Sequence, residues 1–269
     1  MKKIIFLLTI FAAAGTARAG DLQWLPQKKL FTPFIADDTY PSFGAKYSAV
    51  AGGLGYRAEV NMGDEFGIVA KQLASGATVQ FGVMGGVAAR FDISKVTNDF
   101  EIADFSFALP VDYHTGPLTL RGMYWHTSSH VGDDYIIENN IPASQLSKHV
   151  TDDARFYASL EAASFLRLYG GTGYSFNLIP SVADRWRLHG GAEVFTDRTK
   201  PVYYFGAADL QSLGRNNWNP SLALRTGVKR RGQSSSATGF CEFLTGRQPY
   251  LGFMSQSETK WSFGFAVEM

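Results

Sequence analysis

The amino-acid sequence predicts an all-β fold, an antiparallel transmembrane β-barrel of about 12 strands that is preceded by a signal peptide. Three observations carry this prediction: an alternating C-terminal segment, further alternating segments along the chain, and an export signal at the N-terminus. Together they indicate an architecture and a location, the cell outer membrane.

The C-terminal segment alternates strictly between apolar and polar or small residues. The apolar positions are Trp261, Phe263, Phe265, Val267 and Met269, and Ser262, Gly264, Ala266 and Glu268 lie between them. A period of two places successive side chains on opposite faces of a β-strand. A terminal strand with one apolar face is typical of barrels that turn that face to lipid.

The same alternation recurs in segments that we expect to begin near Ser42, Arg57, Ala77, Phe100, Pro117, Asp152, Phe165, Trp186, Pro201, Pro220, Ala237 and Glu258. The charged residues fall on the less apolar face of these segments. They predict an ionic barrel interior built from Arg90, Arg121, Glu161, Arg167, Arg187, Glu193, Arg225, Glu242 and Lys260. A soluble exported β-sandwich, with its polar face in water, is the alternative fold.

The chain divides into three regions. Residues 1–19 have a basic start, an apolar stretch and small residues at Ala17 and Ala19, as a signal peptide requires. Residues 20–41 do not alternate and contain three prolines, so we expect a periplasmic segment folded against the barrel mouth. Residues 42–269 form the barrel. The longest connection, 129–151, should be extracellular because barrels of this kind have short periplasmic turns.

Composition narrows the classes of partner. The formal net charge of +1 gives no reason to expect nucleic acid, and a single cysteine, Cys241, excludes an internal disulfide framework. The expected partners are outer-membrane lipids and, during insertion, the barrel assembly machinery. A homodimeric state stays open.

One predicted strand carries a pair of residues suited to catalysis. His126 and Ser128 share the outward parity of Leu118, Leu120 and Tyr124, so an imidazole base and a hydroxyl nucleophile lie on one face of the strand. The group that orients the histidine should share this face on a neighbouring strand. Asp152 is the first choice and Glu101 the second, whereas Glu161 has lumen parity. The alternative is that His126 and Ser128 lie at a hydrated strand end and have no catalytic role.

Residues Tyr124 to Asp133 resemble the His-x-Ser region of outer-membrane phospholipase A, and the lipid A deacylase barrel is similar. This resemblance implies hydrolysis of lipid acyl esters on the outside of a barrel. In those families an Asn follows the serine, whereas Ser129 and His130 follow it here. The phospholipase also uses calcium, and Asp133 and Asp134 could supply oxygen ligands for Ca²⁺.

A wider resemblance covers nearly the whole mature chain. It rests on Leu30-Phe31 with Pro33 and Ala36-Asp37, on Ser128-Ser129-His130-x-Gly132-Asp133, on Trp218-Asn219-Pro220-Ser221-Leu222-x-Leu224-Arg225, and on Glu242-Phe243-x-x-Gly246 with Pro249. These segments are similar to a family of Gram-negative outer-membrane proteins known only as a domain of unknown function. That likeness implies a barrel and transfers no activity. Three functions therefore stay open: a lipid acyl-ester hydrolase, a non-enzymatic barrel serving as a narrow pore, receptor or structural element, and a soluble binding protein.

Overall fold

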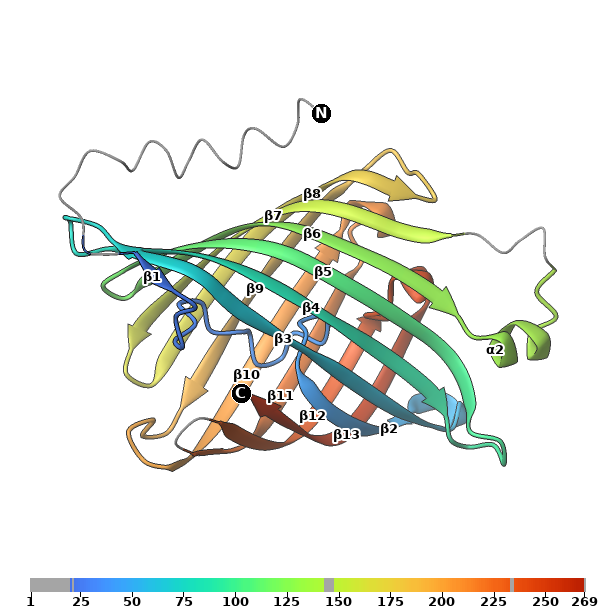
Figure 1. Cartoon of the computed structure of the whole chain (residues 1–269). Helices are drawn as coiled ribbons and strands as arrows, with labels where there is room; N and C mark the ends of the chain where they lie inside the picture. The colour runs from blue at the N-terminus through green and yellow to red at the C-terminus, as the bar shows by residue number, and fades with distance from the viewer. Residues whose placement is uncertain (1–19, 21, 143–147, 233–234, 269) are drawn as a thin grey trace.

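The computed structural model describes residues 20, 22–142, 148–232 and 235–268, and the predicted signal peptide, 1–19, lies outside the described residues. Twelve antiparallel strands form a closed barrel (Figure 1). They are β2 (Phe43–Val50), β3 (Tyr56–Gln72), β4 (Thr78–Asp92), β5 (Asp99–Thr115), β6 (Leu118–Val131), β7 (His149–Ala163), β8 (Leu166–Ile179), β9 (Trp186–Phe195), β10 (Val202–Leu213), β11 (Pro220–Arg231), β12 (Ser236–Arg247) and β13 (Ser257–Glu268). Each strand pairs with the next in sequence, and β13 closes the barrel on β2.

The barrel confirms the predicted fold class. The start of every strand agrees closely with its predicted position, and the largest difference is at β7, which begins at His149 rather than at Asp152. A two-residue strand, β1 (Gln23–Trp24), pairs with Val69 and Ala70 of β3, beyond the part of β3 that β2 covers. None of the helices in the described ranges is long and apolar enough to cross a membrane.

The two faces of the wall differ as the alternation predicts. On β13 the side chains of Trp261, Phe263 and Phe265 are exposed on the outside, whereas Lys260 and Ser262 are buried inside. The exposed large side chains of the other strands are also mainly aromatic or aliphatic. An apolar exterior around a charged interior is what a barrel in lipid requires.

The two ends of the barrel have connections of different length. The connections 73–77, 116–117, 164–165, 196–201 and 232–235 define the short-turn end. The opposite connections, 51–55, 93–98, 132–148, 180–185, 214–219 and 248–256, define the long-loop end. This end carries the short helix α2 (Asp133–Glu138) and the 3₁₀ turns η1 (Ala51–Gly53), η3 (Gly214–Asn216) and η4 (Leu251–Phe253).

The N-terminal segment lies deeper than expected. Instead of resting against the mouth, residues 28–40 run through the lumen, where Phe31 and Phe34 are buried against side chains of the wall. The segment has no strand partner, so lumen side chains satisfy its backbone: Arg167 donates to the carbonyls of Thr32 and Pro33. We call residues 28–40 the plug segment.

Glycines make room for the aromatic side chains that hold the plug segment. A Cβ on Gly171 would collide with the ring of Tyr157, and one on Gly191 would collide with the ring of Tyr169. Both tyrosines therefore lie flat over a glycine of the neighbouring strand. Phe34 stacks on Tyr169, with ring centroids 3.7 Å apart. The glycine pairs inside the strands thus permit close packing in a narrow barrel.

Candidate functional site

The predicted His-x-Ser pair lies on the outer wall of the barrel near the long-loop end. His126 and Ser128 are on β6, close to its end at Val131, and both positions alternate with the buried side chains of Trp125, Thr127 and Ser129. His126 faces Phe107 of β5 on one side and Asp152 of β7 on the other. Both side chains of the pair therefore point away from the lumen, as the alternation predicts.

Asp152 meets His126 directly. The Nδ1 atom of His126 lies 2.7 Å from Oδ1 of Asp152, and the side chains are 36% and 16% exposed. A carboxylate accepts only, so Nδ1 carries the proton, and in the neutral ring Nε2 then has a free lone pair. Such an imidazole is positioned to take a proton at Nε2.

Two further side chains fix the carboxylate of Asp152. The hydroxyl of Tyr124 donates to Oδ1 at 2.6 Å, and the amide of Asn177 on β8 donates to Oδ2 at 2.7 Å. The pairing of β7 with β8 shifts register between Asp152 and Asp153, which marks a β-bulge or irregularity beside this group. Bulges re-aim a side chain and are common next to active sites.

Ser128 is less well fixed than its neighbours. Within the described part of the chain its hydroxyl makes no hydrogen bond, either with His126 or with another residue. Ser129, which stands where the resembling families have Asn, points into the lumen and accepts a hydrogen bond from the backbone N–H of Gly252. Ser129 therefore cannot polarise a substrate carbonyl at the outer face.

Glu101, the second choice for orienting His126, is not on the outer face. The pairing of β4 with β5 shifts register between Arg90 and Phe91, and Glu101 turns into the lumen. There its carboxylate accepts hydrogen bonds from Arg57 and Arg90, at 2.9 and 2.8 Å. The bulge reverses the parity of this part of β5, so the expectation for Glu101 is wrong.

The candidate calcium ligands lie on the long connection between β6 and β7. Asp133 and Asp134 begin α2 with exposed side chains, and Asp134 accepts a hydrogen bond from the backbone N–H of Phe100 at 3.1 Å. Among the described residues no three His, Cys, Asp or Glu side chains gather as metal ligands. Two adjacent surface carboxylates are too few for the six to eight oxygens that Ca²⁺ takes, so the residues do not fit a calcium site on their own.

The lumen contains the predicted charged residues. Eight of them, Arg90, Arg121, Arg167, Arg187, Glu193, Arg225, Glu242 and Lys260, are buried or nearly so, and the ninth, Glu161, lies at the rim with Arg198. Arg121 is one of the largest fully buried side chains. Its guanidinium lies 2.5 Å from Glu65 and 2.6 Å from Asp112, and it stacks on the ring of Phe31 of the plug segment.

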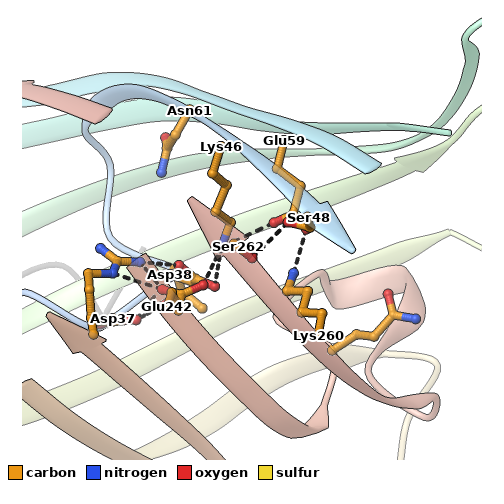
Figure 2. A network of polar contacts seen from close by, with 12 residues as sticks. Asp37, Asp38, Lys46, Ser48, Glu59, Asn61, Glu242, Lys260 and Ser262 are labelled. Atoms are coloured by element: carbon orange, nitrogen blue, oxygen red, sulfur yellow. Dashed lines mark hydrogen bonds and ion pairs between the residues drawn. The ribbon is translucent and has the colours of Figure 1, made fainter. Parts of the chain in front are cut away.

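A second ionic network crosses the seam where the barrel closes. Lys46 of β2 contacts Asp38 of the plug segment at 2.5 Å and Glu242 of β12 at 2.8 Å, and Lys260 of β13 contacts Glu59 of β3 at 2.5 Å (Figure 2). Arg225 adds a third cation beside Asp38 and Glu242. Lys260 also lies 3.2 Å from Glu258. Each of the three cations therefore has at least two carboxylates within 4.0 Å, and the network holds the seam and the plug segment.

Sequence reasoning did not identify several members of these groups. The plug residues Asp38 and Tyr40 lie in a segment without periodicity, so no pattern assigns them to the lumen. Tyr124 shares the outward parity of His126, and a search for polar residues on that parity could have found it. Asn177 has the lumen parity of Ser175 in the sequence, and the register shift between β7 and β8 turns it outward. Arg121 donates a hydrogen bond to the hydroxyl of Tyr40. This contact exists only because the plug segment brings Tyr40 into the lumen.

Comparison with known proteins gives a family and no activity. A profile of the family described as "Protein of unknown function (DUF1207)" matches residues 9–235, which confirms the predicted resemblance to an uncharacterised family. No curated protein and no solved structure matches the chain, so the likeness to phospholipase A stays a prediction. Because the match covers well over half of the 269 residues, the chain belongs to the DUF1207 family.

Proposed function

We propose that this protein is an outer-membrane barrel that hydrolyses acyl esters of membrane lipids at its outer wall. Ser128 is the nucleophile, His126 the general base, and Asp152 the group that holds the imidazole. The single observation that supports this proposal most is the 2.7 Å contact between His126 Nδ1 and Asp152 Oδ1 on an exposed apolar face. Polar side chains on a face that meets lipid cost free energy, and a catalytic role would explain why the chain keeps them there.

The chemistry follows from the proton positions. Nε2 of His126 takes the proton of the Ser128 hydroxyl as its Oγ attacks the ester carbonyl. His126 then gives this proton to the departing alcohol oxygen, and an acyl-serine forms. Water attacks the acyl-serine with its proton passing to Nε2, which releases the fatty acid and restores Ser128. Asp152 stays ionised throughout and stabilises the imidazolium.

The surroundings of the pair fit a lipid substrate. Phe105, Phe107 and Phe176 are exposed on the same wall of the barrel. If the long-loop end is extracellular, as barrels of this type arrange it, the pair lies at the headgroup level of the outer leaflet. A lipid would then reach Ser128 by lateral diffusion, and the enclosed lumen would take no part in the reaction.

The test is an assay of fatty-acid release by the purified mature chain in mixed micelles, with phospholipid and lipid A as substrates. Ser128→Ala and His126→Ala should lower the rate by roughly 10³-fold or more. Ser129→Ala and His130→Ala are matched controls, because Ser129 points into the lumen and His130 is exposed beyond the pair. Equal rates for Ser128→Ala and the wild type would exclude this hydrolase.

A non-enzymatic barrel is the second candidate, and the lack of a hydrogen bond between Ser128 and His126 favours it. An open pore is the version of this candidate that fits least well, because the plug segment and the ionic networks occupy the lumen. We therefore expect little or no single-channel conductance for the wild-type protein in a planar bilayer. Large, ohmic openings would instead favour transport as the function.

A further inference from the structure

Four arginines gather inside the lumen toward the long-loop end. Arg155 comes from β7, Arg187 from β9, Arg215 from η3 and Arg247 from the end of β12. The first three line one cavity, and Arg187 and Arg247 both donate to the same oxygen, Oε1 of Gln211, at 3.2 Å. We call these residues the guanidinium cluster.

The guanidinium cluster is short of anionic partners, unlike the three cations at the seam, each of which has two or more carboxylates within 4.0 Å. Asp153 is the one carboxylate of the described residues within 4.0 Å of its members, 2.7 Å from Arg155 and 3.6 Å from Arg187. Arg247 contacts neutral acceptors, and the guanidinium of Arg215 makes no hydrogen bond or ion pair within the described chain.

Several N–H groups of the cluster are buried without a partner. They are Nε of Arg187, Nε and Nη1 of Arg215, and Nε of Arg247. Such donors are rare in folded proteins, because a buried N–H group without a partner has lost its hydrogen bond to water and gained none within the protein. Burial lowers the pKa of Arg215 to about 10, and the neighbouring charges of Arg187 and Arg155 act in the same direction.

The other carboxylates that face the cluster are directed elsewhere. Asp209 accepts from Tyr169, His189 and Gln211, and Asp37 accepts from Thr39 and Gln211. Asp104 accepts from the backbone N–H of Leu251, while its Oδ1 has no partner in the described residues. Arg215 and Asp104 thus both border the cavity without meeting each other.

The cavity beside the cluster extends to the seam, where Lys46 and Arg225 line it together with Asp38 and Glu59. Its volume is about 100 Å³, which is enough to hold a small anion together with water. Thr127 lines it beside the arginines, and its hydroxyl accepts the indole N–H of Trp125 at 2.7 Å, which leaves its own hydrogen free to donate. Tyr250 and Leu251, at η4, border the cavity at the long-loop end.

We propose that the guanidinium cluster binds a small tetrahedral oxyanion of the phosphate type inside the barrel. Arg155, Arg187 and Arg215 contribute charge and N–H donors, and Thr127 contributes a hydroxyl donor. Planar guanidinium groups match the oxygens of phosphate better than a single ammonium group does. This site is separate from the outer-wall pair, so it stands or falls independently of the hydrolase.

The test is calorimetric titration of the full mature chain in detergent with orthophosphate, sulfate, glycerol phosphate and chloride at matched ionic strength. We expect saturable binding of orthophosphate and no comparable binding of chloride. Arg215→Gln should weaken phosphate binding by roughly tenfold or more, and Arg215→Lys should weaken it less. Tighter binding of glycerol phosphate than of orthophosphate would assign the site to a phosphate ester rather than to the free ion.

Arg230→Gln is the matched control, because it removes the same charge from an exposed position near the short-turn end. It should bind phosphate like the wild type. Since Arg215 has no partner to lose, Arg215→Gln should also fold, and phosphate should raise the unfolding temperature of the wild type but not of this variant. Asp104→Asn, which removes a negative charge from the cavity, should bind at least as tightly as the wild type.

Three outcomes would overturn the proposal. The first is no saturable heat with any oxyanion. The second is equal affinity in the wild type and Arg215→Gln, which would place the anion elsewhere. The third is a tenfold loss of affinity in Asp104→Asn, which would mean that the cavity prefers a cation.

Discussion

His126 and Asp152 face each other across β6 and β7 on the outside of the barrel, with Nδ1 of the histidine 2.7 Å from Oδ1 of the aspartate. Tyr124 and Asn177 supply the other donors to this carboxylate. A carboxylate with three donors is rigid, and an imidazole held at Nδ1 presents Nε2 to one side only. The geometry is therefore that of an oriented base rather than of a mobile surface histidine.

Replacing Asp152 by Asn should separate orientation from catalysis. An Asn can present its NH₂ group to His126 and stabilise the wrong tautomer, so we expect fatty-acid release to fall by about 10²–10⁴-fold. Tyr124→Phe keeps the contact between His126 and Asp152 and should cost less than roughly tenfold. The double variant Asp152→Asn with Ser128→Ala should be no slower than Ser128→Ala alone, because groups that act as one unit are not additive. Additive losses would show that Asp152 acts outside this unit.

We expect the buried ion pairs of Arg121 with Glu65 and Asp112 to contribute strongly to the free energy of unfolding of the barrel. In Arg121→Met, Glu65 and Asp112 lose their buried partner, and the expected loss is about 3–5 kcal/mol in the free energy of unfolding. Arg198→Met is the control, since its pair with Glu161 is partly exposed and should contribute at most about 1 kcal/mol.

Denaturant unfolding in detergent, followed by the gel shift between folded and unfolded barrel, measures both variants. Adding Glu65→Gln and Asp112→Asn to Arg121→Met should restore part of the loss, because no unpaired charge then remains. A similar midpoint for Arg121→Met and Arg198→Met would contradict the view that this cluster stabilises the barrel.

The alternation of apolar side chains was sufficient to predict the strands and the side of the wall on which most residues lie. It also placed Asp152 on the face of His126, because both strands keep their period of two up to this point. The prediction failed at Glu101, where one extra residue in β5 reverses the parity of the chain beyond it. A bulge shifts the alternation by one residue, and the strand residues beyond this one, Asp99 to Glu101, are too few to show the shift in the sequence.

The path of the plug segment was not predictable for a different reason. Residues 28–40 have neither a helical nor a strand period, and their position depends on partners that are distant in sequence, such as Glu193, which accepts the backbone N–H of Ile35 at 2.8 Å. The charges of the lumen predicted an ionic interior but not its pairing. That pairing depends on Asp38, which the plug segment brings into the barrel.

A charged residue on the outer wall should prevent stable insertion into lipid. Phe263 is exposed on β13 between Cys241 of β12 and Tyr47 of β2. Phe263→Arg should cost about 2–4 kcal/mol in folding into vesicles if the wall meets the centre of a bilayer. Val96→Arg, in an exposed loop at the long-loop end, should fold like the wild type. Equal folding of both variants, or a wild-type chain that is folded and monodisperse without detergent, would argue for a soluble barrel.

Phe34 should determine whether the plug segment stays in the lumen. It stacks on Tyr169 and meets the rings of Tyr157 and His189 edge-on, so Phe34→Ala leaves a cavity and should lower the free energy of unfolding by roughly 3–5 kcal/mol. Trp24→Ala removes a larger but exposed ring near the same end of the chain and should change the free energy of unfolding by no more than about 0.5 kcal/mol. Because the plug segment obstructs the lumen, Phe34→Ala should also show channel openings in a planar bilayer that the wild type and Trp24→Ala lack. A stable Phe34→Ala barrel with unchanged conductance would mean that the ion pairs of Asp38 hold the segment without the aromatic stack.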